Sequence, residues 1–224
     1  MGDVNLNMDF NQQLAIETTA MAWSPSPAAG VERKRLEREN AESGRATSVV
    51  RYGAGSSFPT HVHGGGEEFL VLEGVFSDEN GHYPVGSYVR NPPGSSHAPF
   101  SDGGCTILVK LHQMDASDQI TVVHRTTDEP WSAGEVAGHA RQQLNDNPRE
   151  RVSFEKLAAG TALPPIKDPN GQEFYVVSGS LRVNGGEHPA GTWLRFPPGE
   201  TTRISATTAT VFWHKRGHLA EPPR

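Results

Sequence analysis

Short apolar segments separated by turn-forming residues run along this chain of 224 residues, and segments with a helical period are scarce. A typical example is residues 67–72 (EEFLVL), which are rich in β-forming side chains and are followed by Gly74. The 24 glycines and 17 prolines are spread through the sequence rather than clustered, as many short strands joined by tight turns require. The pattern therefore predicts an all-β protein.

The strands expected from this pattern are residues 14–18, 45–52, 58–63, 67–72, 87–90, 106–111, 120–124, 154–157, 163–166, 173–177, 192–196 and 210–215. One further segment, residues 31–39 (VERKRLERE), has the charge mix of an exposed helix. The proline-rich residues before it and the strand-dense context favour a solvated edge strand, and a helix is the alternative.

The chain contains an internal repeat. Shifting the sequence against itself by 105 residues gives a gap-free match from about Gly55 to Lys110. The matched residues are mostly glycines and prolines, which fix turns and must recur if two halves share a backbone path. We therefore expect a duplicated β-domain. It comprises an N-terminal extension at residues 1–22, a first barrel at 23–125 and a second barrel at 126–224.

Four side chains of the first copy have the chemistry of a metal site. His61 and His63 are two residues apart, so on a strand both imidazoles face the same side. Three glycines then reverse the chain, and Glu67 opens the next strand on that side. His97 follows a Pro-Pro-Gly turn and is expected to approach from a facing strand. Three imidazoles and one carboxylate suit Zn, Fe, Ni, Co or Mn, and they disfavour Ca and Mg.

Glycines and prolines frame these residues in two motifs. The first contains Gly55, five residues, His61-x-His63, three residues, Glu67, six residues and Gly74. The second contains Gly86, five residues, Pro92-x-Gly94, two residues and His97. Both resemble the motifs of the cupin superfamily, with Ser101 where the second pattern has Asn. The resemblance implies a bicupin, with two tandem jelly-roll β-barrels, in which His61, His63, Glu67 and His97 bind one divalent transition metal.

Three runs within these motifs carry a finer resemblance, namely Gly64–Glu68, Leu72-Glu73-Gly74 and Asn91–Gly94. They make the chain most similar, within the superfamily, to the ChrR-like cupins. That group is named after an anti-sigma factor whose C-terminal domain is a zinc-binding cupin, so the resemblance favours zinc. Acetylacetone-cleaving dioxygenases have similar motifs.

The second copy lacks the ligands. At the same offset the four positions are Ile166, Asp168, Gln172 and Thr202, while the turn residues persist. We therefore expect one metal ion per chain. The role expected for the second barrel is structural, and an apolar pocket for a small ligand is the alternative.

Two functions are compatible with such a site. The first is a metal-binding sensor or regulatory module, as the ChrR resemblance implies, with a regulatory protein such as a sigma factor as its partner. The sigma-binding domain of ChrR is not matched, because the first 22 residues are too short for it and the chain has no cysteine pair. The second is a dioxygenase acting on a small diketone or phenolic ketone. The sequence leaves enzyme status open, because four protein ligands close a tetrahedral site but leave two positions free on an octahedral metal.

Composition restricts partners and location. The net charge of −6 gives no reason to expect direct binding of nucleic acid. The sequence shows neither a signal peptide nor an apolar stretch of the roughly 20 residues needed to span a bilayer. The single Cys105 cannot form an intrachain disulfide, so we expect a cytoplasmic protein. Leu70 and Leu72 place apolar side chains on the face opposite Glu67, so we expect this face to be covered by the other barrel or by a second subunit. Because cupins are commonly dimers, the resemblance implies a homodimer.

Overall fold

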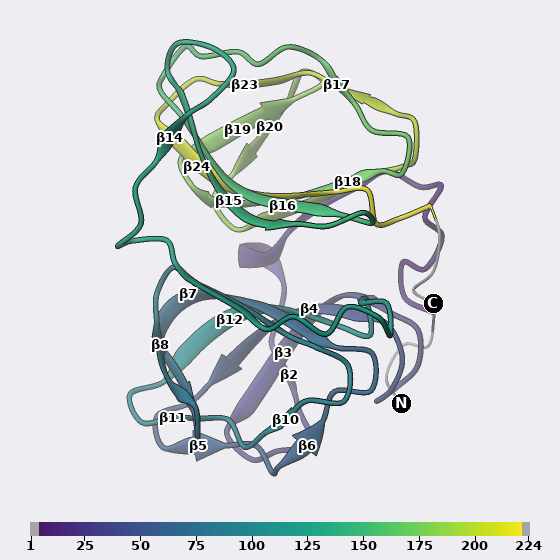
Figure 1. Ribbon diagram of the computed structural model, residues 1–224, viewed down its shortest axis with the longest axis vertical. Coiled ribbons are helices and arrows are strands. Elements are labelled where there is room, and N and C mark those ends of the chain that lie inside the picture. Colours follow the sequence, from purple (N-terminus) through teal and green to yellow (C-terminus); the bar gives the residue numbers. More distant parts are fainter. Residues whose placement is uncertain (1–4, 221–224) are drawn as a thin grey trace. The chain divides into compact units, whose positions relative to one another are not determined.

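The computed structural model describes residues 5–220, which fold almost entirely into β-strands. The chain divides into two compact units (Figure 1). Of the described residues, the first unit contains 5–8 and 21–128, and the second contains 9–20 and 129–220. No helix within this range is long and apolar enough to cross a membrane.

The first unit is a barrel whose main sheet has the order β13-β9-β7-β12-β4-β3-β2. Beside this path β8 and β11 pair with β7, β5 pairs with β11, and β6 and β10 form a separate two-stranded sheet. The strands are β2 (Ser24–Pro25), β3 (Val31–Arg38), β4 (Ala46–Tyr52), β5 (Ser56–Ser57), β6 (His61–Val62), β7 (Glu67–Asp78), β8 (Gly81–Pro84), β9 (Ser87–Asn91), β10 (Ser96–His97), β11 (Phe100–Ser101), β12 (Cys105–Leu111) and β13 (Val122–Arg125).

The second unit repeats this architecture, with a main sheet of order β1-β21-β18-β24-β16-β15-β14. Two smaller sheets have the orders β17-β22 and β20-β19-β23. Its elements are β1 (Leu14–Glu17), the 3₁₀ helix η1 (Thr18–Ala20), β14 (Ser132–Ala133), β15 (His139–Asp146), β16 (Arg151–Leu157), β17 (Ile166–Lys167), β18 (Gln172–Ser178), β19 (Ser180–Val183), β20 (Gly186–Pro189), β21 (Thr192–Phe196), β22 (Thr201–Thr202), β23 (Ile204–Ala206) and β24 (Thr210–Arg216).

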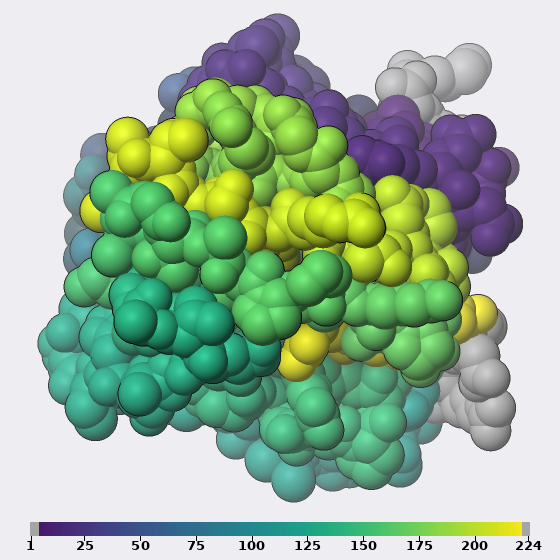
Figure 2. Space-filling model, turned by 90° about the horizontal axis from the view of Figure 1, so that it is seen from above, coloured from purple at the N-terminus to yellow at the C-terminus, as the bar shows by residue number. Residues whose placement is uncertain are grey.

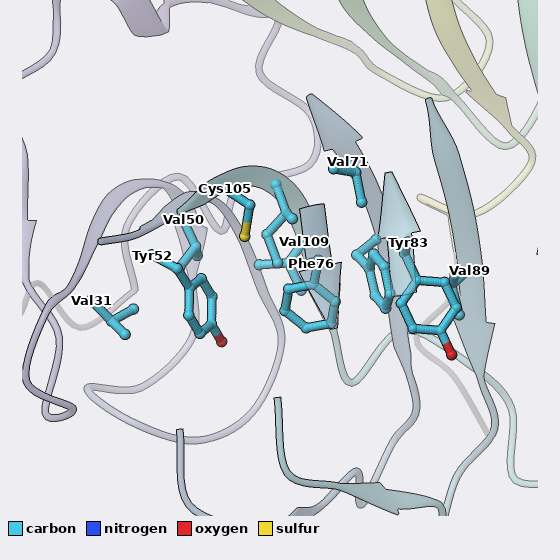
Figure 3. Close-up of a cluster of buried hydrophobic side chains, with 11 residues drawn as sticks. Val31, Val50, Tyr52, Val71, Phe76, Tyr83, Val89, Cys105 and Val109 are labelled. Carbon is cyan, nitrogen blue, oxygen red and sulfur yellow. The ribbon is translucent and has the colours of Figure 1, made fainter. Parts of the chain in front are cut away.

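Each unit has its own apolar core. In the first unit, side chains from several strands point toward one another, among them Val50, Phe76 and Val109 (Figure 3). In the second unit, Phe174, Phe196 and Phe212 are fully buried in the corresponding cluster. The prediction of two tandem all-β barrels is confirmed.

The repeat is visible strand by strand. From β4 onward the second unit follows the first at the 105-residue offset, so that Ala46–Tyr52 recurs as Arg151–Leu157. The three strands before it recur at an offset of 108 residues, so that Val31–Arg38 recurs as His139–Asp146. The difference arises in the loop after these strands, which spans residues 39–45 in the first unit and only 147–150 in the second.

The first strand of each repeat pairs into the barrel of the other repeat. β1 begins the first repeat but lies antiparallel to β21 of the second unit, with Ile16 opposite Trp193. β13 begins the second repeat and pairs with β9 of the first unit. In Figure 2 most of the second unit is coloured green to yellow, whereas β1, which pairs with β21 of that unit, has the purple of the N-terminus. The expected extension at residues 1–22 therefore contains the predicted strand, and that strand serves the second barrel.

Residues 31–38 form a strand, and the prediction that this strand is solvated is wrong. β3 pairs with β4 along its length and is covered at its first residues by β2. Its residues are buried or half-buried, and Glu37 is fully buried. The Glu37 carboxylate accepts hydrogen bonds from Arg45 Nε at 3.1 Å and Thr47 Oγ1 at 2.8 Å. Most charged residues of β3 are therefore part of the interior of the first unit.

Candidate metal centre

The four expected ligands come from three neighbouring elements of the first barrel. His61 lies on β6 and His63 directly follows it, while Glu67 is the first residue of β7. His97 lies on β10, which pairs with β6 so that His97 is opposite His61. Between β6 and β7 the chain reverses at Gly66, whose φ of 77° is readily adopted only by glycine. The fold therefore brings together all four side chains.

Their donor atoms converge. One nitrogen or oxygen from each of the four residues lies within 4.8 Å of the other three. His63 Nε2 is 3.3 Å from His61 Nε2 and 3.5 Å from Glu67 Oε2, and His97 Nε2 is 3.4 Å from Glu67 Oε2. His97 Nε2 is buried and has no hydrogen-bond partner among the described residues. A buried polar atom of this kind needs a ligand, so the cluster is compatible with one metal ion.

The outward nitrogens of the three imidazoles are all held by acceptors. Nδ1 lies 2.9 Å from the Pro59 carbonyl in His61, 3.0 Å from Ser95 Oγ in His63 and 3.0 Å from Asp78 Oδ2 in His97. Ser95 Oγ donates its own proton to the Pro92 carbonyl at 2.6 Å, so it accepts from His63. Each Nδ1 is therefore protonated, and the lone pair of each Nε2 points into the cluster.

The carboxylate is oriented in the same way. Asn91 lies opposite Glu67 in the pairing of β9 with β7, and Asn91 Nδ2 donates a hydrogen bond to Glu67 Oε2 at 3.1 Å. Glu67 is buried, with 6% of its side chain exposed. A buried carboxylate held beside three imidazoles is an anionic donor for a cation.

Burial and charge set the protonation of the cluster. Burial lowers the pKa of His63, which favours the neutral, ligating form. For His97, burial also acts to lower the pKa, but the hydrogen bond that His97 donates to Asp78 and the charge of Glu67 outweigh it and raise the pKa. A metal ion must therefore displace a proton from His97 when the pH falls below that raised pKa.

The cluster forms part of the wall of a cavity of about 310 Å³. His61, His63 and Glu67 contribute to this wall, together with Tyr52 of β4. Burial, followed by the negative charge of Glu67, raises the pKa of Tyr52, so its phenol stays protonated. Most of the remaining wall is apolar, and its members are Val31, Ala46, Val50, Phe58, Val62, Ile107, Val109 and Leu111. The arrangement provides a metal-ligand set beside space for a small molecule.

The family model described as the ChrR cupin-like domain matches residues 11–115 and again residues 119–220. The chain belongs to the ChrR cupin-like family. The two matches begin just before β1 and β13, and so they coincide with the repeat seen in the strands. A search of curated proteins gave no significant match.

This ChrR-like cupin also shares its fold with solved structures of low sequence identity. One is a candidate dioxygenase from Nostoc punctiforme, with 16% identity, 94% of this chain and 85% of that chain covered, and a TM-score of 0.77. A second is the protein Ylba from E. coli, with 12% identity, coverage of 93% and 92%, and a TM-score of 0.70. A third is the salicylate 1,2-dioxygenase of Pseudaminobacter salicylatoxidans, with 16% identity, coverage of 83% and 76%, and a TM-score of 0.64.

In the second barrel of this ChrR-like cupin, the equivalent positions do not form a metal-ligand group. Ile166 packs against the apolar core, and Gln172 Oε1 lies 3.2 Å from His214 Nε2 and 3.4 Å from Thr202 Oγ1. Within residues 5–220, the cluster around His63 is the one group of four His and Glu residues with converging donors. The loss of the ligands from the second copy therefore leaves one candidate site per chain.

Sequence reasoning missed several residues of the site. Asp78 and Ser95 orient two of the histidines but are not motif residues, and Asn91, which orients Glu67, was noted only as part of the resemblance to the ChrR-like cupins. His112 lines the cavity and has a φ of 56°, whereas the equivalent residue of the second repeat is Gly217. The sequence signal that could have identified His112 is its position opposite a glycine of the repeat, because a side chain is rarely kept in such a conformation.

Proposed function

We propose that this ChrR-like cupin is a metal-dependent enzyme of the dioxygenase type that acts on a small diketone or phenolic ketone. His61, His63, Glu67 and His97 would hold one redox-active divalent metal ion. The observation that carries the proposal is the cavity of about 310 Å³, because three of the four donors line it. A structural zinc site closed by four protein ligands has no need of an adjoining cavity.

The chain's own residues have defined tasks in this proposal. When bound, an iron(II) ion or a similar metal supplies open coordination positions and the redox chemistry of dioxygen. Asp78 keeps the proton of His97 on Nδ1, and Asn91 holds the carboxylate of Glu67. The protonated phenol of Tyr52 is a hydrogen-bond donor for a substrate oxygen, and the apolar part of the wall contacts the carbon skeleton of the substrate. Cleaving one carbon–carbon bond with insertion of both oxygen atoms makes the substrate its own reductant.

The likeness of fold to two dioxygenase-named structures supports this proposal only at the level of architecture. The match to the ChrR cupin-like model supports a second candidate, a sensor whose metal is zinc and whose cavity binds a signal molecule. In that function a regulatory protein such as a sigma factor binds the cupin, and its binding depends on whether the signal molecule is present. The two candidate functions differ in whether the metal has coordination positions open to a substrate and in whether the protein consumes oxygen.

The test begins with metal-free protein loaded anaerobically with iron(II). Air and a panel of β-diketones and hydroxyaryl ketones are then added, and dissolved oxygen is followed with an electrode. We expect consumption that depends on substrate and is lost in Glu67→Gln and His97→Ala. His82→Ala is the matched control, because His82 is exposed and lies outside the cluster.

Cobalt(II)-loaded protein provides the opposing outcome. A four-coordinate visible spectrum that no diketone alters, together with silence at the oxygen electrode, would reject the enzyme and favour the sensor. A spectrum of higher coordination number that changes on addition of a diketone supports an open site.

A further inference from the structure

The inner face of β3 carries an unusual concentration of positive charge. Arg33, Arg35 and Arg38 lie opposite Val50, Ser48 and Ala46 of β4, respectively. These β4 residues are spaced by two, so their side chains share one face, and all three line the cavity. The arginines therefore share that face as well, although Arg35 and Arg38 are three residues apart in sequence.

A β-bulge makes this possible. The pairing of β3 with β4 shifts register between Arg35 and Glu37, which inserts one extra residue into β3. Without the bulge, Arg38 would point to the opposite face from Arg33. With it, both Arg33 and Arg38 line the same cavity as the metal-ligand cluster. Figure 3 shows Val31 of β3 directed into the same interior as Val50 and Tyr52.

The three guanidinium groups converge on one carboxylate, that of Glu42. Arg33 makes a two-pronged contact with it, Nη2 to Oε1 at 2.8 Å and Nη1 to Oε2 at 3.0 Å. Arg38 Nη2 is 3.6 Å from Oε2, and Arg35 Nη2 is 3.9 Å from Oε1. Glu42 comes from the loop at residues 39–45, and 52% of its side chain is exposed, against 11% for Arg33 and 5% for Arg38. A half-exposed carboxylate from the surface loop thus meets cations that are buried in the barrel interior.

The charges do not balance. Three cations face one carboxylate, and burial followed by the positive charge of Arg33 lowers the pKa of Arg38. Arg33 Nε and Arg35 Nε are buried without a hydrogen-bond partner among the described residues. Excess positive charge and unused donors in a partly buried site are costly unless an anion compensates them. A second anionic group in the cavity would do so.

Comparison with the second repeat shows that the arginine cluster is not a general feature of the barrel. It keeps the bulge, here between Gln143 and Asn145, so the equivalent positions are Arg141, Gln143 and Asp146. The remaining arginine already has a buried partner, because Arg141 Nε donates to Glu155 Oε1 at 2.8 Å. The loop that carries Glu42 is shortened to residues 147–150. The arginine cluster is therefore present in the barrel that has the metal-ligand set and absent from the barrel that lacks it.

We propose that Arg33 and Arg38 form a binding site for the carboxylate group of the molecule that occupies the cavity. Glu42 fills this position when no ligand is bound and is displaced by the ligand's carboxylate. The inference deepens the proposed function, on which it rests for the metal, by assigning the ligand to small diketones or phenolic ketones that also carry a carboxylate. Guanidinium groups suit this task because their paired N–H donors match the two oxygens of a carboxylate.

The test uses two probes that differ in one group. Acetylpyruvate is acetylacetone in which a carboxylate replaces one methyl group. Binding of each to zinc-loaded full-length protein is measured by calorimetry, so no turnover is involved. We expect acetylpyruvate to bind at least about tenfold more tightly, because hydrogen bonds to charged groups are the stronger kind. Arg38→Gln should weaken the binding of acetylpyruvate about tenfold to hundredfold and leave the affinity for acetylacetone unchanged.

Two further variants sharpen the result. Glu42→Gln removes the internal competitor and should tighten acetylpyruvate binding, whereas unchanged affinity would reject the displacement of Glu42. Arg51→Gln is the matched control, because Arg51 lies on β4 but pairs with Glu32 on the outer face and is 45% exposed. Metal content and thermal unfolding establish that each variant is folded and loaded with zinc. If Arg38→Gln does not fold or does not bind zinc, Arg33→Lys, which keeps the charge but loses the paired N–H donors, replaces it.

Equal affinity for the two probes, or equal loss of both in Arg38→Gln, would overturn the carboxylate site. Failure of the proposed function looks different. Tight, arginine-dependent binding of acetylpyruvate without oxygen consumption by the iron(II) protein would retain the carboxylate site and reject the dioxygenase.

Discussion

At the scale of single residues, Asp78 connects the metal-ligand set to the backbone. Its Oδ2 accepts from His97 Nδ1, while its Oδ1 accepts from the backbone N–H of Asn80 at 2.7 Å and of Gly81 at 3.2 Å. Burial acts to raise the pKa of Asp78, but the hydrogen bonds from His97 and Asn80 outweigh it, so the pKa lies below its usual value. Asp78 is thus a fixed anion that orients His97.

Replacing Asp78 by Asn should weaken metal binding about tenfold to hundredfold, the range typical of groups that orient metal ligands. The amide keeps the shape but loses the charge that makes His97 a stronger donor. Competition with a chromophoric chelator measures the affinity. Asp102→Asn is the control, because Asp102 is exposed in the same barrel. Equal affinities of the wild type and Asp78→Asn would show that His97 needs no anionic partner.

A second residue-scale prediction concerns His214 of β24. It is buried, stacked on Phe174 at a centroid distance of 4.3 Å, and burial followed by the positive charge of Arg216 places its pKa well below the usual value. The unfolded chain takes up a proton near pH 6.5, whereas the folded chain does not. Stability should therefore fall as the pH drops below about 6.5, by up to about 1.4 kcal/mol per pH unit.

This slope is measured by urea unfolding of the second barrel at a series of pH values from 8 to 5, with hydrogen exchange of the β18 and β24 amides as the readout. His214→Gln keeps a donor for Gln172 but cannot ionise in this range, so the slope should decrease by the contribution of one proton. An unchanged slope would mean that His214 is not the titrating group.

The four ligands could be predicted because their spacing is part of a motif, but Asp78 could not. Glu67 and Asp78 are separated by an odd number of residues on one strand, which places them on opposite faces of an ideal strand. The pairing of β12 with β7 skips Leu72, because Ile107 lies opposite Val71 and Thr106 opposite Glu73. This bulge rephases the second half of β7 and turns Asp78 toward His97.

At the scale of elements, the same bulge depends on a glycine. Gly74 follows the bulge with a φ of 70°, and a Cβ atom there would collide with the Gly104 carbonyl oxygen. Gly179 of the second repeat has a φ of 77° and faces the Ala209 carbonyl oxygen in the same way. The glycines that revealed the repeat are therefore required both for their left-handed backbone conformation and for close contact with a neighbouring strand.

Gly74→Ala should destabilise the first barrel by about 2–5 kcal/mol, the sum of a left-handed alanine and an overpacked contact. Gly55→Ala isolates the first effect, because Gly55 has a φ of 73° with nothing within 4 Å of the added carbon. It should cost only about 1–2 kcal/mol. Chemical unfolding with metal-free protein measures both. Equal losses would show that the contact with Gly104 relaxes freely.

Strand prediction failed where the side chains gave no alternation. β15 is an eight-residue strand of sequence HARQQLND that no pattern indicated, and its bulge breaks the period of two. For β3, the context gave the right element but the wrong environment. Charged side chains on a strand suggest solvent, whereas here Glu37 accepts hydrogen bonds from Arg45 and Thr47, and Arg33 pairs with Glu42 of the loop after β3. Such pairing between neighbouring elements is not visible in the residue pattern of β3 alone.

At the scale of the whole molecule, metal should affect one barrel only. Elemental analysis should find close to one transition metal per chain, because converging donors occur in the first unit alone among the described residues. Removing the metal with a chelator should destabilise that unit by about 2.7 kcal/mol if free metal had been a hundred times its dissociation constant. His63→Ala should contain almost no metal and show no chelator effect. Two tightly bound equivalents, or an equal shift in both barrels, would reject the one-site assignment.

Because the first strand of each repeat pairs into the barrel of the other repeat, the N-terminal residues stabilise the second barrel. Residues 9–20 precede the first barrel in sequence but are anchored in the second unit. Thr18 is the fixed point: its backbone N–H and its Oγ1 both donate to the Gly191 carbonyl, at 2.9 and 2.6 Å. Arg195 adds a hydrogen bond to the Asp9 carbonyl at 2.9 Å and lies over the Phe10 ring. The stability of the second barrel therefore depends on residues at the opposite end of the chain.

Thr18→Pro removes both donors while suiting the start of a 3₁₀ helix, where proline's fixed φ is tolerated. At about 0.5–1.5 kcal/mol per hydrogen bond, we expect the second barrel to lose about 1–3 kcal/mol. Hydrogen exchange of the β21 amides should accelerate by the same free energy, because β1 covers this edge of the sheet. Thr18→Ser keeps both donors and should behave as the wild type. Metal content and unfolding of the first barrel should not change, although Thr18 is closer to that barrel in sequence. Loss of stability in the first barrel instead would mean that residues 9–20 belong with it.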